Sequence, residues 1–307
     1  MNSNPSDGAF TRAMPIVFVL IWSTGFIVAR YGMPNAPPFK FLTLRYALSV
    51  LCFLLWIGIS RARWPQGGRQ VFHLAVLGIL MQAMYLGGVW AAIKAGMGSG
   101  LSALIVSLQP VLTAVWVSSM GGHVAKRQWL GLACGFAGLL LVVWHKLGHG
   151  AIGDQADLMS LSFAVGALLA ITVGTLYQKR FVAPCDVRSA NLVQQTAALL
   201  VTFPLALTEA ETMHWNVELA GAMGWSVLAL TLGGSSLLYL LIQHGAATAV
   251  TSLLYLVPPT TAVMAWLLFR EPITAMTLAG TALTAFGVSL VLRAPRPAST
   301  RSIRRTP

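Results

Sequence analysis

Long apolar runs alternate with short polar segments along almost the whole chain, and two of these runs are interrupted by proline. Residues 98–121 contain Pro110, and residues 248–272 contain Pro258 and Pro259. Both runs are long enough to cross a hydrocarbon core of about 30 Å, which needs roughly 20 helical residues. A proline frees a carbonyl that lipid cannot satisfy, so protein or water must do so. Each of these two segments is therefore predicted to line a cavity.

The pattern as a whole predicts an all-α integral membrane protein with ten transmembrane helices. The runs cover residues 14–28, 41–59, 71–93, 99–120, 128–144, 158–177, 191–207, 221–242, 248–269 and 276–292. The first run follows a polar start containing Arg12, but it lacks a small-residue cleavage site, so we expect a retained span rather than a signal peptide. The two runs that meet at residues 96–100 are together too long for one helix, which favours two.

Composition agrees with this class. Apolar residues make up 56% of the 307 residues and charged residues only 9%, whereas a soluble domain carries about 25% charged residues. The net charge of +12 would suit nucleic acid only as a basic patch on a folded surface. Here the charges lie between apolar runs, so nucleic-acid binding is not expected. Cys52, Cys134 and Cys185 show neither paired nor metal-ligand spacing, so no disulfide framework, metal site or cofactor is expected.

The distribution of Lys and Arg predicts the orientation, because these residues are retained on the cytoplasmic side. With the N-terminus inside, most of the 20 basic residues fall in cytoplasmic segments. The outside segments hold only Arg30, Lys40, Lys94, Lys146 and Arg270. We therefore expect a multi-pass protein of the inner (cytoplasmic) membrane with both termini in the cytoplasm.

A constant shift of 149 residues relates the two halves of the chain. It pairs Gly25 with Gly174, Arg30 with Lys179, Ile93 with Ile242, Gly96 with Gly245, Pro110 with Pro259, Gly131 with Gly280 and Gly138 with Gly287. This predicts five-helix repeats at residues 14–145 and 157–292, joined by a loop at 146–156, with a cytoplasmic segment at 1–13 and a basic cytoplasmic tail at 293–307. An odd number of spans inverts the second repeat relative to the first. Inverted repeats are typical of transporters with a site near the bilayer midplane.

The residues also resemble a known family. The segment IWSTGFIVAR, the pair Pro37 and Pro38, TLRYALSVL around Arg45, and FREPITAMTLAGTALTAFGVSL are similar to the EamA family of the drug/metabolite transporter superfamily. The resemblance covers residues 14–292. It implies a ten-helix carrier in which the first, third, fourth, sixth, eighth and ninth helices surround a central cavity, with the fifth and tenth to one side. One departure is that Glu271 and Pro272 have Gly122 and His123 as counterparts in the first half.

Amides, hydroxyls and aromatic rings inside the predicted spans are the candidate substrate-binding groups. They are Gln82, Tyr85, Gln109, Ser235, Tyr239, Gln243 and Tyr255. Such groups can hydrogen-bond and stack on a small polar molecule. They can instead join neighbouring helices, at about 0.6 kcal/mol per bond, and this role is favoured for any single Ser or Thr. For Gln109, Gln243, Tyr239 and Tyr255 the two interpretations weigh almost equally, with substrate binding slightly favoured because polar groups inside a membrane are costly. Pro110, Pro258 and Pro259 are predicted to act as hinges in gating.

The ionisable residues in or near the spans leave further alternatives open. For Arg45, whose counterpart is the neutral Gln194, anchoring of the helix with a side chain that snorkels to the interface is favoured over substrate contact. His73 and His244 are expected to be solvated interface residues rather than proton relays. No Asp or Glu lies inside a predicted span, which argues against an intramembrane carboxylate relay. The glycines of the fifth and tenth spans favour close helix packing over a dimer seam.

The resulting prediction is a secondary transporter, and an exporter in particular, of a small organic metabolite such as an amino acid or related compound. The expected partners are this metabolite and membrane lipid, and a homodimer is left open. An intramembrane enzyme would need a convergent nucleophile and base or a metal site, which the spans do not offer. A non-transporting receptor or channel-like protein of the same fold is the alternative, and a channel would need a continuous polar pore face.

Overall fold

A computed structural model of the chain describes residues 5–60, 62–119, 126–148, 154–234, 237, 256–271 and 273–292, and all regular elements in these ranges are helical. The first half contains α1 (Pro5–Gly32), α2 (Pro38–Ile59), α3 (Gly68–Gly78), η1 (Ile79–Leu86), α4 (Gly87–Lys94), α5 (Ser99–Val106), α6 (Gln109–Ser119) and α7 (Lys126–Gly148). The second half contains α8 (Asp154–Phe181), α9 (Val187–Thr208), α10 (Val217–Trp225), η2 (Ser226–Gly234), α13 (Val257–Phe269) and α14 (Ala275–Leu292).

Five of the described helices are long and apolar enough to cross a membrane. They are Pro38–Ile59, Gly68–Lys94, Leu158–Phe181, Val187–Thr208 and Val217–Gly234. Shorter apolar helices cover Ile16–Gly32, Ser99–Thr113, Trp129–Gly138, Val257–Phe269 and Ala275–Gly287. The expected boundary near residues 96–100 is confirmed, because α4 ends at Lys94 and Gly96 adopts a φ of 101°, a conformation that favours glycine.

Two long helices each contain a segment wound as a π-helix. One helix runs through α3, η1 and α4, and the other runs through α10 and η2. π-Helical turns are rare in proteins, but those that occur often lie at functional sites. The 149-residue shift carries residues 79–86 onto residues 228–235, which overlap η2 almost completely. The two irregular windings therefore occur at corresponding places in the two halves.

The prolines singled out by sequence lie at helix starts. The fourth span is divided at Ser107 and Leu108 into α5 and α6, and Pro110 is the second residue of α6. In the ninth span, Pro258 and Pro259 lie in the first turn of α13. A proline is tolerated in a first turn because its missing N–H would have had no intrahelical partner there. The break at Pro110 is thus confirmed, whereas residues 248–255, before α13, lie outside the described residues.

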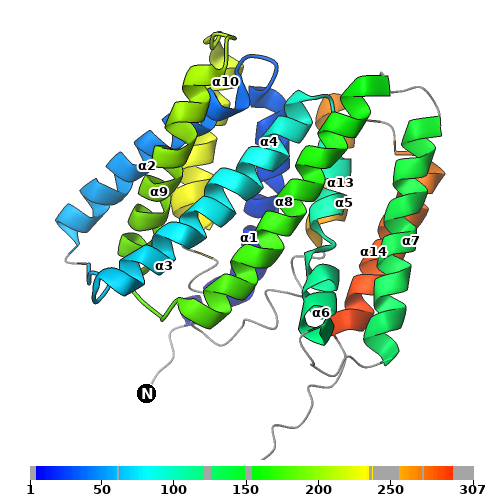
Figure 1. Cartoon of the computed structure of the whole chain (residues 1–307), viewed down its shortest axis with the longest axis horizontal. Helices are drawn as coiled ribbons and strands as arrows, with labels where there is room; N and C mark the ends of the chain where they lie inside the picture. The colour runs from blue at the N-terminus through cyan, green and yellow to red at the C-terminus, as the bar shows by residue number, and fades with distance from the viewer. Residues whose placement is uncertain are drawn as a thin grey trace, which may run out of the picture.

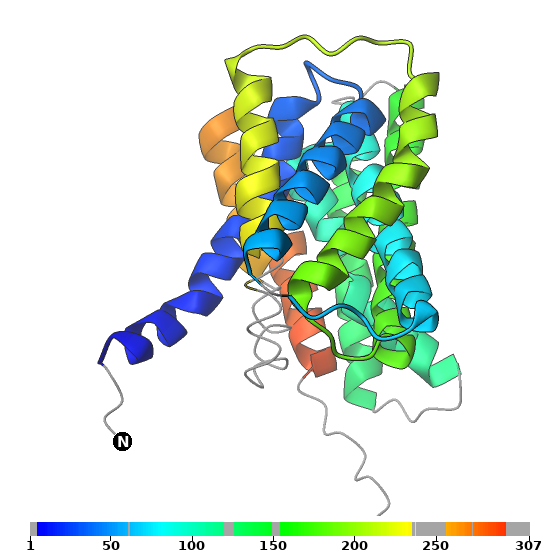
Figure 2. The ribbon, with the colours of Figure 1, turned by 90° about the vertical axis from the view of Figure 1, so that its left-hand side faces the viewer.

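The helices form one bundle in which pairs from the two halves lie side by side (Figures 1 and 2). Helix α2 packs along α9, and η1 and α4 pack along α8. Helices α7 and α14 form a pair at one edge of the bundle (Figure 1). This edge position agrees with the place that the family resemblance implies for the fifth and tenth helices.

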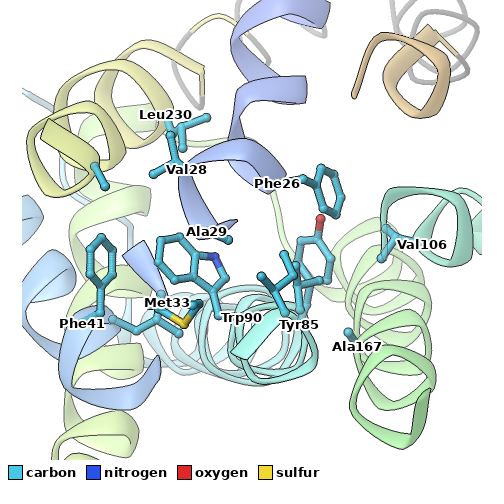
Figure 3. Packing of buried hydrophobic residues seen from close by; sticks show 14 of the residues in the cluster. Phe26, Val28, Ala29, Met33, Phe41, Tyr85, Trp90, Val106, Ala167 and Leu230 are labelled. Carbon is cyan, nitrogen blue, oxygen red and sulfur yellow. The ribbon is translucent and has the colours of Figure 1, made fainter. Parts of the chain in front are cut away.

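Aromatic residues fill the centre of the bundle between α1, α2 and the helix that runs through η1 and α4 (Figure 3). The rings of Phe41 and Trp90 have centroids 4.4 Å apart. Tyr85 stands beside Trp90 with its hydroxyl directed toward Phe26, and Val106 and Ala167 lie on its other side (Figure 3). These large buried rings hold the first helix against the second and third.

Glycines bring α7 and α14 into direct backbone contact. A Cβ atom on Gly138 would lie 2.6 Å from the carbonyl oxygen of Gly280, and one on Gly287 would overlap the backbone of Gly131 and Gly135. Small residues allow membrane helices to approach this closely. The expectation of close helix packing is therefore confirmed.

We expect Gly287→Ala to lower the thermal midpoint of the detergent-purified protein by several degrees, because overpacking costs about 1–3 kcal/mol. The midpoint is measured by heating samples to a series of temperatures and quantifying the protein that stays monodisperse in size-exclusion chromatography. Gly166→Ala on α8 is the matched control, since a Cβ there meets no atom within 4 Å. An unchanged midpoint for Gly287→Ala would show that α7 and α14 are not packed as described.

Candidate functional site

The structure describes three of the seven substrate-binding candidates. Gln82 and Tyr85 lie on η1, and Gln109 is the first residue of α6. The remaining four, Ser235, Tyr239, Gln243 and Tyr255, lie outside the described residues. Both η1 and α6 pack on α8. Within the described part of the chain, no hydrogen bond joins Gln109 to Gln82 or Tyr85.

Gln109 joins two helices. Its Nε2 donates to Thr175 Oγ1 on α8 at 2.7 Å, and its backbone carbonyl accepts a hydrogen bond from Thr113 Oγ1 at 2.9 Å. The first bond links the two halves of the chain. It is the interhelical role that the sequence left open beside substrate binding.

Tyr46 connects α2 to the π-helical segment η1. Its hydroxyl donates to the carbonyl oxygen of Gln82 at 2.7 Å, and its side chain has no exposed surface. Wider π-turns alter the backbone hydrogen-bond ladder, so a side-chain donor from a neighbouring helix helps to satisfy it. Sequence reasoning missed Tyr46; the signal that could have found it was its place beside Arg45 in an apolar run.

The adjacent residue Arg45 connects α2 to the other π-helical segment. Its Nε and Nη2 atoms donate to Thr231 Oγ1 on η2 at 3.3 and 3.1 Å. Thr231 in turn donates to the carbonyl oxygen of Ser226 at 2.9 Å. Arg45 is only 4% exposed. The expected snorkelling of its side chain to the interface is therefore wrong, because the guanidinium is buried against η2. Helix anchoring and substrate contact both stay predictions for Arg45.

The charged residues with ionic partners lie at the ends of the helices, away from Arg45. The described ion pairs are Lys94 with Glu211 at 2.5 Å and Arg188 with Asp186 at 2.6 Å. No carboxylate is paired with Arg45 among the residues that the structure describes. The same residues contain no cluster of three or more His, Cys, Asp and Glu side chains that could hold a metal ion.

Two carboxylates stabilise helix starts at the end of the bundle expected to face outward. Glu209 accepts from the backbone nitrogens of Phe39 and Lys40 at 2.9 and 2.8 Å, and so caps α2. Glu271 accepts from the backbone nitrogen and hydroxyl of Ser99, at the start of α5. Arg270 has a φ of 53° and ends α13, which turns the chain toward this contact. Carboxylates at helix N-termini also interact favourably with the helix dipole.

A hollow of about 290 Å³ lies at the opposite end, where α3 starts and α8 ends. Its lining residues are Gln66, Arg69, Gln70, His73, Arg180 and Phe181. His73 Nδ1 lies 2.7 Å from Tyr177 Oη, and the two groups share a hydrogen bond between α3 and α8. His73 is half-buried, so it is less solvated than the sequence suggested. Arg69 and Arg180 are among the basic residues of the expected cytoplasmic segments, and their positions in the sequence do not indicate that they share a pocket.

A much smaller hollow lies beside the prolines of α13. Its volume is about 10 Å³, and Ser107, Pro258, Pro259, Thr281 and Thr284 are among its lining residues. This is close to the space that one water molecule needs. The proline-containing start of α13 therefore faces polar side chains of α14 and the break between α5 and α6, rather than lipid alone.

Comparison with known proteins decides the class. The model of the EamA-like transporter family matches residues 13–144 and again residues 158–293. The chain belongs to the EamA-like transporter family. Its resemblance to this family, read from the sequence, is thereby confirmed, and an EamA-like protein is a membrane transporter rather than an enzyme.

Relatives of this EamA-like chain carry general names. The uncharacterized inner membrane transporter YedA of Escherichia coli K12 is 23% identical over 69% of the chain and 66% of its own length, so this match spans just under two thirds of that relative. An uncharacterized transporter of Archaeoglobus fulgidus is 23% identical over 91% of the chain and 96% of its own length. A probable amino-acid metabolite efflux pump of Salmonella typhimurium is 22% identical over 90% and 92%.

A solved crystal structure without a functional description is similar to this chain with a TM-score of 0.63. The match covers 90% of this chain and 94% of the chain in that crystal structure, at 15% sequence identity. At this identity the likeness shows the fold alone. It agrees with an all-helical fold.

The ion pair of Asp186 with Arg188 lies outside the spans and makes the stability of the fold depend on pH. Asp186 caps α9 and is held by Arg188, whose Nε and Nη2 atoms donate to its carboxylate at 2.9 and 2.6 Å. Hydrogen bonding to Arg188 holds the pKa of Asp186 below its ordinary value. A depressed pKa stabilises the fold fully above the unfolded-state pKa of about 3.9, and this contribution is lost as the pH falls through the folded-state pKa.

We therefore expect Asp186→Asn, which can still cap the helix, to lower the thermal midpoint by a few degrees at pH 7. The difference from the wild type should shrink as the pH is lowered toward about 3. Thermal unfolding across this pH range is the measurement. A difference that stays constant from neutral to acidic pH would mean that the charge of Asp186 does not contribute.

Proposed function

We propose that the chain is a secondary transporter that exports a small organic metabolite, such as an amino acid or a related compound, across the cytoplasmic membrane by alternating access. The observation that carries this proposal is that each half of the chain matches the EamA-like transporter family separately. The Salmonella relative named as a probable amino-acid metabolite efflux pump supports both the direction and the substrate class.

The proposed architecture is ten transmembrane helices in two inverted five-helix repeats. Contacts between α7 and α14 support it. Thr284 Oγ1 lies 3.4 Å from the carbonyl oxygen of Gly135, and these two positions are 149 residues apart. A residue that contacts its own repeat counterpart lies near the axis relating the repeats. The close approaches of Gly138 to Gly280 and of Gly287 to Gly131 also exchange under the same shift.

Contacts between α2 and α9 give independent support. At one end of this pair, Glu209 caps α2 through Phe39. The shift relates this contact to one between Ser60 and Arg188, and there Arg188 Nη1 donates to both oxygens of Ser60 at 3.0 and 2.6 Å. Corresponding loops thus cross to the neighbouring helix at opposite ends of the pair, as an inverted repeat requires.

Within this architecture, both termini face the cytoplasm, and the polar residues predicted from sequence line the path between the repeats. Pro110, Pro258 and Pro259 act as hinges, since each lies at a helix start that can tilt without breaking an intrahelical hydrogen bond. The bond between Gln109 and Thr175 is broken when α6 moves, which frees the Gln109 amide to meet substrate. Assembly into a homodimer is compatible with this architecture.

Transport is tested with the full-length protein in liposomes loaded with a mixture of amino acids, and external amino acids are measured with time. We expect efflux above empty liposomes. We expect Gln109→Ala to reduce its rate roughly 5- to 30-fold, because a buried hydrogen bond to a polar ligand is worth about 1–2 kcal/mol. Ser162→Ala is the matched control, because Ser162 is exposed on α8 and bonds only within its own helix.

Thr175→Val separates two roles of Gln109, because it removes the interhelical bond and keeps the amide. An equal loss of transport in Thr175→Val and Gln109→Ala would assign Gln109 to helix packing. Stepwise conductance in single-channel recordings, without substrate-dependent efflux, would favour the channel-like alternative. Ligand binding without efflux would favour a non-transporting receptor. Absence of both efflux and ligand binding for every metabolite tested would overturn the proposed function.

A further inference from the structure

We propose that Arg45 binds an anionic group, most simply a carboxylate, of the transported substrate. This inference rests on the proposed function and narrows its substrate class. The observation behind it is a buried guanidinium that joins the two halves of the chain and has only a neutral hydroxyl as its described partner.

No carboxylate among the residues that the structure describes balances the charge of Arg45. The whole chain contains eight acidic residues, and none lies inside an expected span. Asp186, Glu209, Glu211 and Glu271 are bound to other groups near helix ends. A charge in the interior of a membrane protein is costly, so such residues normally face a partner or a substrate path. Thr231 supplies hydrogen bonds to Arg45 but no negative charge.

The geometry of the contact leaves a fork that suits a carboxylate. The hydrogen bonds described for Arg45 run from Nε and Nη2 to the same oxygen of Thr231, at 3.3 and 3.1 Å. A guanidinium presents parallel N–H donors that match the two oxygens of a carboxylate. A single hydroxyl oxygen occupies the position that two carboxylate oxygens fill better. The substrate carboxylate would therefore displace Thr231 when the halves move apart.

A second buried polar group, on the neighbouring helix, has no hydrogen-bond partner among the described residues. Gln195 on α9 is 1% exposed, and neither its amide nitrogen nor its amide oxygen has a hydrogen-bond partner among the described residues. Helix α9 packs along α2, which carries Arg45. A buried amide without partners is costly unless a ligand or water satisfies it. Gln195 therefore offers a donor and an acceptor to a ligand or to water, and no described contact joins it to Arg45.

The charge is confined to one half of the chain. The 149-residue shift relates the contact of Arg45 with Thr231 to the pair Gln194 and Gln82, and both of these are neutral amides. An anionic group is therefore attracted to the α2 side only, which sets one orientation for the substrate. The hollow lined by Arg69 and Arg180 adds positive charge at the end expected to face the cytoplasm, and a positive mouth raises the local concentration of anions.

The test uses the full-length, detergent-purified protein and measures thermal stabilisation by each amino acid beside its carboxamide, which differs only in the charged group. Native-state ligands raise the midpoint by mass action. We expect at least one acid to stabilise the wild type and its amide not to do so. Arg45→Gln should raise the half-saturating concentration of that acid roughly 10- to 100-fold, because hydrogen bonds to charged groups are strong.

The ligand-free midpoint separates binding from anchoring. Arg45→Gln should keep or raise this midpoint, since it removes an uncompensated buried charge. A lowered ligand-free midpoint with unchanged half-saturation would assign Arg45 to helix anchoring and overturn the inference. Thr231→Val is the matched control: it removes the present partner of Arg45 but keeps the guanidinium, so binding of the acid should be retained.

Arg45→Lys covers the case in which Arg45→Gln does not fold. Lysine keeps the charge and lacks the fork, so we expect weaker acid binding at a normal ligand-free midpoint. Equal binding of the acid and the amide, with transport intact, would overturn the role of Arg45 and leave the proposed function standing. Absence of any transport in liposomes would instead overturn the proposed function, and this inference with it.

Discussion

In lipid, each backbone N–H and C=O group needs a partner inside the protein, and this constraint explains most of what the described residues do. Regular elements in the described ranges are helical because a helix satisfies its own backbone. Where the helix departs from regular winding, another element compensates. Tyr46 donates to the Gln82 carbonyl at the π-helical segment η1, and Glu271 accepts from the first turn of α5. Irregular backbone is therefore found where two helices meet.

The same constraint also bears on how the two halves of the proposed transporter can move relative to each other. Inside the bundle, the halves are joined by hydrogen bonds such as Gln109 with Thr175 and Arg45 with Thr231, beside apolar surfaces. Each such bond is worth little in a membrane, because the separated groups find other partners. The glycine-lined pair α7 and α14 lies at the edge and stays in close backbone contact (Figure 1). In the proposed transport cycle, movement between the halves costs least in the centre, where polar groups can exchange a protein partner for a substrate.

The chain places its charges according to cost. Carboxylates and lysines pair at helix ends, where water is close, as Lys94 does with Glu211. Arg45 departs from this rule, since it is buried beside a hydroxyl. A protein that needed only to tie α2 to η2 could do so with a neutral side chain at lower cost. Arg45 and Tyr46 are consecutive residues of α2. Arg45 contacts η2 in the second half of the chain, and Tyr46 contacts η1 in the first half.

The sequence by itself determined the helical membrane class, the family and the break at Pro110, because hydrophobic run length and proline chemistry act locally. It also predicted the ten-helix inverted repeat, which the contact of Thr284 with Gly135 supports. It did not place the side chains. Arg45 near a helix start was expected to reach the interface, yet the packing of α2 against η2 turns it inward. Likewise, only the tertiary structure joins Arg69 to Arg180 in one pocket, because residues far apart in sequence meet only through helix packing.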